Sequence, residues 1–228
     1  MLTKCFGIIS YLPDIEPLRT KRKDKLTNLI KTLDKYFKLP VVIVAQNWRE
    51  EDFQITYSAP IKIYSYPQPL GITKARITLR EMLLKEDYDY FIYIDDDGNI
   101  ICNQSSVKAY LHKIDMHPDM FGLFKGWSWH RLLAISKTML ELMSYDFIKD
   151  YESIRGEIWE DVAYIRTYKV IYPDKWYIIR VNGMDEKQPL SEDDPDTTWY
   201  KPELGSNKDL RDRTERVIEE WIKYLREA

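Results

Sequence analysis

Apolar and polar positions in the first two thirds of the chain follow two patterns, which predict strands and helices in turn. Apolar runs over residues 5–10, 41–45 and 61–66 predict strands. The run 41–45 has no polar alternation, as expected of a strand covered on both faces. Between the first two runs, apolar residues recur at helical spacing over 26–37. This alternation is typical of a mostly parallel sheet with helices packed on its faces.

The second part of the predicted sheet is built around the most apolar run of the chain, at residues 90–94. The helical stripe before it, over 73–83, gives a helix with Thr73 as the expected N-cap. The same patterns predict further strands at 121–124, 132–135 and 176–181, and helices at 137–143 and 159–168.

The C-terminal part has a different character. Residues 183–207 collect acidic side chains without apolar periodicity, which predicts a long loop or a lid. A stripe from Val217 to Leu225 then predicts an amphipathic helix docked on the body. We therefore expect one domain over 1–182, with 183–228 forming an acidic loop and a helix packed on that same domain.

Composition narrows the class of protein. The chain has 228 residues, of which 44% are hydrophobic and 31% charged, which fits a globular domain and excludes collagen-like or wholly disordered chains. A net charge of −3 gives no general attraction to polyanions. Cys5 and Cys102 form no disulfide framework, and no apolar run has the length of a membrane span. We therefore expect a cytoplasmic protein without a membrane span.

The run Asp95-Asp96-Asp97-Gly98 at the end of the apolar strand carries the strongest chemical signal. Three adjacent carboxylates repel one another unless a cation lies between them. Strand alternation would project Asp95 and Asp97 to one side and Asp96 to the other. Two carboxylates at that spacing suit Mg²⁺ or Mn²⁺, which fill their remaining positions with water and phosphate oxygens. A turn favoured by Asp and Gly is the structural alternative.

Three segments in order carry a resemblance to a known family. They are Gly-x-x-x-Ala-Arg at 71–76, the strand ending in Asp-x-Asp at 95–97, and Trp-Glu-Asp at 159–161. Together they resemble a GT-A glycosyltransferase of the family-two type over roughly residues 4–181. The resemblance implies a three-layer α/β/α, Rossmann-like nucleotide-diphospho-sugar transferase fold. It also implies a metal-dependent transfer of a sugar from a nucleotide donor, with UDP preferred.

The resemblance further implies a donor site at the carboxyl edge of the sheet. Tyr11 and Pro13 would lie near the base, and Arg76 would pair with the nucleotide or its diphosphate. The family often has an acidic residue at the end of the second strand, where this chain has Gln46-Asn47. The amide of Gln46 could still hydrogen-bond a pyrimidine edge.

Around the metal, the resemblance assigns the three acids separately. Asp97 would hold the Mn²⁺ or Mg²⁺ ion that bridges the diphosphate, and Asp95 would contact ribose or a water on the metal. We also expect Asp96 to be one of the donor-binding residues.

For the acceptor side, the resemblance points to Asp161 as general base in an inverting displacement, with Glu160 as the alternative. Acids in a first helical turn also gain stability from the helix dipole, which is their structural explanation. The family builds its acceptor pocket in the segment that here holds Trp127, Trp129 and His130, and sugar rings stack on indole faces.

Acceptor identity stays open at this stage. A saccharide or glycan is the default, and a nucleic-acid base or a protein side chain could use the same machinery. A nucleotidyltransferase that makes sugar nucleotides is one rival, but it needs a Gly-rich basic loop where this chain has residues 11–14, Tyr-Leu-Pro-Asp. A non-catalytic saccharide-binding protein of the same fold is another.

Overall fold

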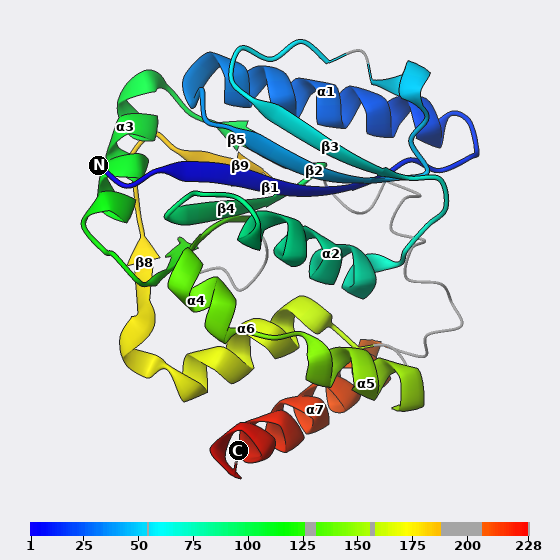
Figure 1. Ribbon diagram of the computed structural model, residues 1–228, viewed down its shortest axis with the longest axis vertical. Helices are drawn as coiled ribbons and strands as arrows, with labels where there is room; N and C mark the ends of the chain where they lie inside the picture. Colours follow the sequence, from blue (N-terminus) through cyan, green and yellow to red (C-terminus); the bar gives the residue numbers. More distant parts are fainter. Residues whose placement is uncertain (54, 126–130, 156–157, 188–206, 228) are drawn as a thin grey trace.

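The computed structural model describes residues 1–53, 55–125, 131–155, 158–187 and 207–227. Strands and helices alternate through most of the chain (Figure 1). The elements are β1 (Lys4–Tyr11), α1 (Leu18–Tyr36), β2 (Val41–Gln46), η1 (Glu50–Asp52), β3 (Ile61–Tyr66), α2 (Ile72–Leu84), β4 (Tyr90–Asp95), β5 (Asn99–Ile101), α3 (Gln104–Asp115), β6 (Phe121–Phe124), β7 (Arg131–Ser136), α4 (Lys137–Leu142), α5 (Asp146–Arg155), α6 (Glu160–Ile171), η2 (Pro173–Lys175), β8 (Trp176–Ile179), β9 (Asp185–Lys187) and α7 (Asn207–Glu227).

The main sheet has seven strands in the order β3-β2-β1-β4-β7-β6-β8. Neighbours from β3 to β4 are parallel, and so are β6 and β8, whereas β7 runs antiparallel to both β4 and β6. A separate two-stranded ribbon pairs β5 with β9. The expected α/β class with a mostly parallel, Rossmann-like sheet of the GT-A kind is confirmed.

Helices cover both faces of the sheet, and a hydrophobic core lies on each face. α1 packs over one face, and α2 and α4 to α7 lie on the other (Figure 1). The core under α1 joins Leu26 and Leu33 to apolar residues of β1 and β2 and to α3. The opposite core joins Leu79 of α2 to Tyr164 of α6 and Trp221 of α7. Both faces of the central strands are therefore buried, which explains their unbroken apolar runs.

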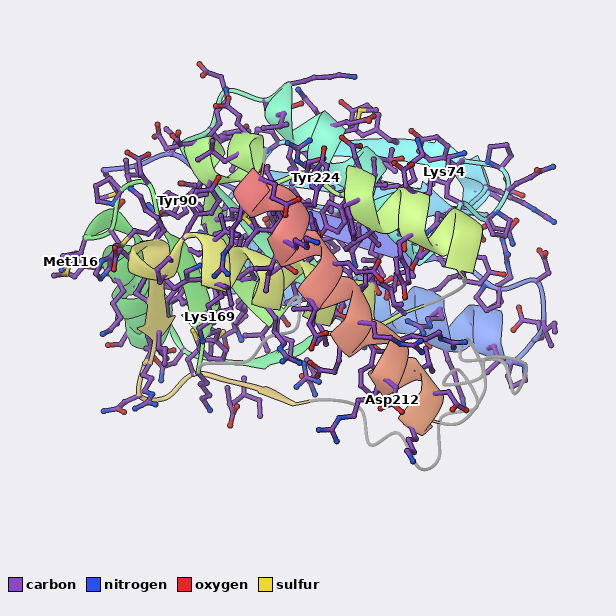
Figure 2. The ribbon with its side chains drawn as sticks, turned by 90° about the horizontal axis from the view of Figure 1, so that it is seen from below. Lys74, Tyr90, Met116, Lys169, Asp212 and Tyr224 are labelled. Carbon is purple, nitrogen blue, oxygen red and sulfur yellow. The ribbon has the colours of Figure 1, made fainter. Side chains whose placement is uncertain are left out.

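The C-terminal helix α7 packs along α6 and also touches α5. Trp221 is 1% exposed and packs against Tyr168 with ring centroids 5.2 Å apart. Figure 2 shows α7 lying across the outside of the helical layer, with Tyr224 and Asp212 towards its two ends. None of the helices in the described ranges is long and apolar enough to cross a membrane.

Two expectations are wrong in detail. Thr73 is not the N-cap of α2, because Gly71 takes that position with φ of +80°, a conformation that glycine adopts without strain. The loop expected from residue 183 is interrupted by β9, whose backbone pairs with β5. The helices α3 and α5 were not predicted, although the buried residues Val107, Tyr110 and Ile114 of α3 recur at helical spacing.

Candidate active site

The carboxyl ends of β1, β2 and β4 meet at one edge of the sheet, because these strands run parallel in register. Asp95 is the last residue of β4, and Asp96 and Asp97 form the turn that follows. The Gly98 N–H donates to the Asp95 carbonyl at 3.0 Å and closes this turn. The acidic run is thus both a turn and the tip of a buried strand.

Asp96 is held by a buried polar network. Its carboxylate accepts from the Ser10 hydroxyl at 2.6 Å and from Arg22 Nη1 at 3.0 Å. The Trp48 indole N–H donates to the Ser10 hydroxyl at 3.1 Å, which links the end of β1 to the residues after β2. Burial raises the pKa of Asp96, against the opposite pull of Arg22. With an exposure of only 6%, Asp96 fixes the turn from inside.

Asp95 points to the other side, towards Arg76 of α2. Arg76 Nη2 lies 3.4 Å from the Asp95 carboxylate, and Arg76 Nε donates to the Glu160 carboxylate at 2.7 Å. Arg76 and Glu160 are 4% and 3% exposed. Burial acts to lower the pKa of Arg76, but the charges of Asp95 and Glu160 raise it above its ordinary value. One guanidinium therefore joins the tip of β4 to the first residue of α6, and we call this arrangement of Arg76, Asp95 and Glu160 the Arg76 clamp.

Asp161 lies beside this clamp and is 6% exposed. Burial, the largest cause, and repulsion from Glu160 and Asp95 together raise its pKa from 3.8 to about 8, although Arg76 and the Val162 N–H act in the opposite direction. Burial also raises the pKa of Asp95 to about 6, with Arg76 opposing and the neighbouring acids adding. The side chain of Asp95 keeps 36% exposure, so water weakens the effect of burial there. Three carboxylates thus share one cation, Arg76.

Asp97 lies between the two arginines of the site. Its carboxylate is 4.0 Å from Arg22, and its charge raises the pKa of Asp95, which faces Arg76. Strand alternation ends with β4 at Asp95, so the direction of the Asp97 side chain follows from the turn.

The carboxylate ligands around the turn fit a hard divalent cation. Asp97 raises the pKa of Asp95, so negative charge is in excess where a cation would lie. Mg²⁺ and Mn²⁺ are held by one or two protein carboxylates together with substrate phosphates, a role that Asp95 and Asp97 could fill. Within the described ranges, no three His, Cys, Asp or Glu side chains are arranged to hold a metal ion. Oxygen atoms from a bound diphosphate would have to complete the coordination.

The predicted base-binding residues lie at the same edge. Tyr11 and Gln46 are register partners at the ends of β1 and β2. Gln46 is 5% exposed, and its amide oxygen accepts from the Leu70 N–H at 2.8 Å, so it anchors the segment before α2. The Pro13 carbonyl accepts from Arg19 at 3.2 Å. Burial raises the pKa of Tyr11, and the charge of Asp14 adds to the shift.

The three predicted acceptor residues, Trp127, Trp129 and His130, lie outside the described residues. The flanking strands are described: β6 ends at Phe124, and β7 begins at Arg131, whose register partner is Ile94 near the tip of β4. Arg131, the first described residue after this segment, therefore lies next to the strand that ends in the acidic turn.

Arg22 is a site residue that was not predicted from the sequence. Arg22 precedes Leu26 by one helical turn, and Leu26 begins the stripe that continues through Leu29, Ile30 and Leu33 into the core. A charged residue on the buried face of a helix needs a partner, and that position was the available signal.

Comparisons with known proteins support the fold. No family model and no curated protein sequence matches the chain. Among solved structures, S. aureus TarS has a TM-score of 0.55 at 12% identity over 80% of this chain, and S. aureus TarS 1–349 has 0.51 at 13% over 78%. The complex of TarS 1–349 with UDP-GlcNAc has 0.51 at 15% over 78%. The chain spans 36% of the length of TarS and 58% and 56% of the two shorter chains.

Proposed function

We propose that the chain is a glycosyltransferase that moves a sugar from a nucleotide-diphosphate donor, with UDP as the preferred nucleotide, to an acceptor hydroxyl. Support for the donor class comes from the shared fold and from the UDP-GlcNAc complex of TarS 1–349. Support from the chain itself comes from the acids gathered at the carboxyl edge of the sheet, where open α/β sheets bind ligands.

The observation that carries the proposal is the Arg76 clamp. Residues 95 and 160 are far apart in sequence, yet Arg76 contacts both carboxylates, at 3.4 and 2.7 Å. The acidic turn and the Glu-Asp pair of α6 therefore belong to one site. A transferase needs both parts together: one beside the departing diphosphate and one beside the attacking hydroxyl.

In the proposed reaction, Asp161 accepts the proton of the acceptor hydroxyl as its oxygen attacks the anomeric carbon. The bond between that carbon and the diphosphate oxygen breaks, and its electron pair leaves with the nucleoside diphosphate, which inverts the configuration. Only ionised Asp161 can accept the proton, and its pKa of about 8 makes it a stronger base than an ordinary aspartate. Glu160 is bound to Arg76 and is the less available of the two acids.

A divalent cation, Mn²⁺ or Mg²⁺, would neutralise charge on the leaving diphosphate when bound. Asp97, at 32% side-chain exposure, and Asp95 are the residues that would hold it. The proposed acceptor is by default a saccharide or glycan.

Thermal unfolding with nucleoside diphosphates tests the donor and the metal together. We expect UDP with Mn²⁺ to raise the melting temperature, since a ligand at 100 times its Kd adds about 2.7 kcal/mol. We expect little shift from either component alone. In Asp97→Ala the combined shift should disappear, whereas Asp174→Ala, at an exposed acid of η2, should keep it.

Three results would contradict parts of this proposal. A shift without Mn²⁺ that survives in Asp97→Ala would reject the role of Asp97. Equal shifts with all nucleotides would reject the preference for UDP. UDP binding without any hydrolysis or transfer of UDP-GlcNAc and other UDP-sugars would favour a non-catalytic binding protein.

A further inference from the structure

The start of α6 lacks a capping side chain of its own. Its N-cap is Trp159, whose side chain makes no capping hydrogen bond within the described residues. Backbone N–H groups in the first turn of a helix have no partner inside the helix. The two acids of the proposed site, Glu160 and Asp161, are the first residues of this turn. Their position therefore depends on contacts from elsewhere in the fold.

One such contact comes from α7. The Trp159 N–H donates to the hydroxyl oxygen of Thr214 at 3.1 Å, and this hydroxyl donates in turn to the Leu210 carbonyl at 2.8 Å. Thr214 is 1% exposed, so water does not replace it freely. The hydroxyl acts as acceptor and donor at once, which fixes its direction.

The rest of α7 holds Thr214 in place. Val217 and Trp221, one and two turns further along, are buried in the core shared with α6. At the surface, Arg166 of α6 pairs with Glu215, the neighbour of Thr214. The hydroxyl is thus presented to Trp159 by a helix that packs on α6.

We infer that Thr214 is a positioning residue for the proposed catalytic acids: through the Trp159 N–H, α7 sets the start of α6 on one side while Arg76 holds Glu160 on the other. This assigns the C-terminal helix a part in the site and rests on the proposed function. Thr214 touches no reacting atom. Its effect comes from the placement of Asp161, since reacting groups displaced by about 1 Å can lose 10²-fold in rate.

Valine has the shape of threonine without the hydroxyl, and serine keeps the hydroxyl. In the full chain we expect Thr214→Val to lower the turnover of UDP-GlcNAc hydrolysis by about 10-fold, with less than about a two-fold change in donor KM. Amide exchange at Trp159 should become about 10-fold faster. Thr214→Ser should restore both values. Alanine also lacks the hydroxyl and, unlike valine, places no methyl group in its position. Thr214→Ala should therefore behave like Thr214→Val.

Thr32 provides a matched control. Its hydroxyl donates to the Asn28 carbonyl at 3.0 Å, the same bond along a helix, but it lies in α1 away from α6. Thr32→Val should leave hydrolysis and Trp159 exchange unchanged. Wild-type rate and exchange in Thr214→Val and Thr214→Ala would overturn the inference. If the wild type hydrolyses no UDP-sugar, the proposed function fails, and the exchange data alone decide whether Thr214 anchors α6.

Discussion

Two arginine-centred groups flank the tip of β4, and they differ in charge balance. In the first, Arg22 faces the buried Asp96, which also accepts from the Ser10 hydroxyl, and lies 4.0 Å from the partly exposed Asp97. In the second, Arg76 is the shared cation for Asp95, Glu160 and Asp161. Burial raises the pKa of a carboxyl in both groups, but Asp96 has an arginine and a hydroxyl as its own donors, while Asp161 shares Arg76 with two other acids.

The two groups therefore have different roles, one structural and one chemical, although adjacent acids belong to them. The Arg22 group satisfies its buried carboxylate and fixes the turn. The Arg76 group holds a carboxyl, Asp161, with a pKa of about 8, close to the pH at which a general base works well.

The first prediction concerns turnover. Asp161→Asn should lower the rate of donor hydrolysis or transfer by about 10² to 10⁴-fold, the typical loss for a general base. Binding of UDP with Mn²⁺ should stay intact, because Asp161 lies on the acceptor side of the clamp. The check is steady-state kinetics together with calorimetric binding of UDP.

Glu160→Gln is the companion variant, since it removes the charge that pairs with Arg76 but leaves Asp161. A rate near that of the wild type in Asp161→Asn, with a large loss in Glu160→Gln, would make Glu160 the base. Loss of UDP binding in Asp161→Asn would instead mean that the two parts of the site cannot be separated.

The second prediction concerns folding. Arg22→Met keeps the apolar stem but leaves Asp96 buried without its cation, and breaking a buried pair in this way costs about 3 kcal/mol. The pair is well buried, at 12% and 8% side-chain exposure. Urea unfolding measures the loss, which we expect to exceed the accompanying loss of UDP affinity.

The control for Arg22→Met is Arg166→Met. Arg166 and Glu215 form a pair with 46% and 41% exposure, and exposed pairs contribute about 0 to 1 kcal/mol. Equal losses in the two variants would show that the Arg22 group is an ordinary surface contact.

The fold was largely predictable from sequence because buried strands carry unbroken apolar runs. The strand at 41–45 and the end of β4 at the acids appear in the structure where the pattern put them. The site was harder, because the Arg76 and Glu160 pairing joins residues 84 apart in sequence, and periodicity carries no information at that distance. The role of Arg22 could have been predicted, because it lies one helical turn before the buried stripe of α1.

The third prediction concerns pH. The pKa of Asp161 is about 8 in the folded chain and near 3.8 unfolded, so between these values the folded state holds a proton that the unfolded state lacks. This group therefore lowers the free energy of unfolding as pH rises from about 4 to 8, by up to about 1.4 kcal/mol per pH unit. In Asp161→Asn that contribution is absent.

The stability advantage of Asp161→Asn over the wild type should accordingly grow between pH 5 and pH 7, when urea unfolding is measured at each pH. Asp174→Asn, at an exposed acid, should differ from the wild type by a constant amount. In parallel, kcat/KM of the wild type should rise with pH and level off near 8, because that ratio follows ionisation of the base in the free enzyme. A flat stability difference would mean that Asp161 is ionised throughout, and the Arg76 group would then be as balanced as the Arg22 group.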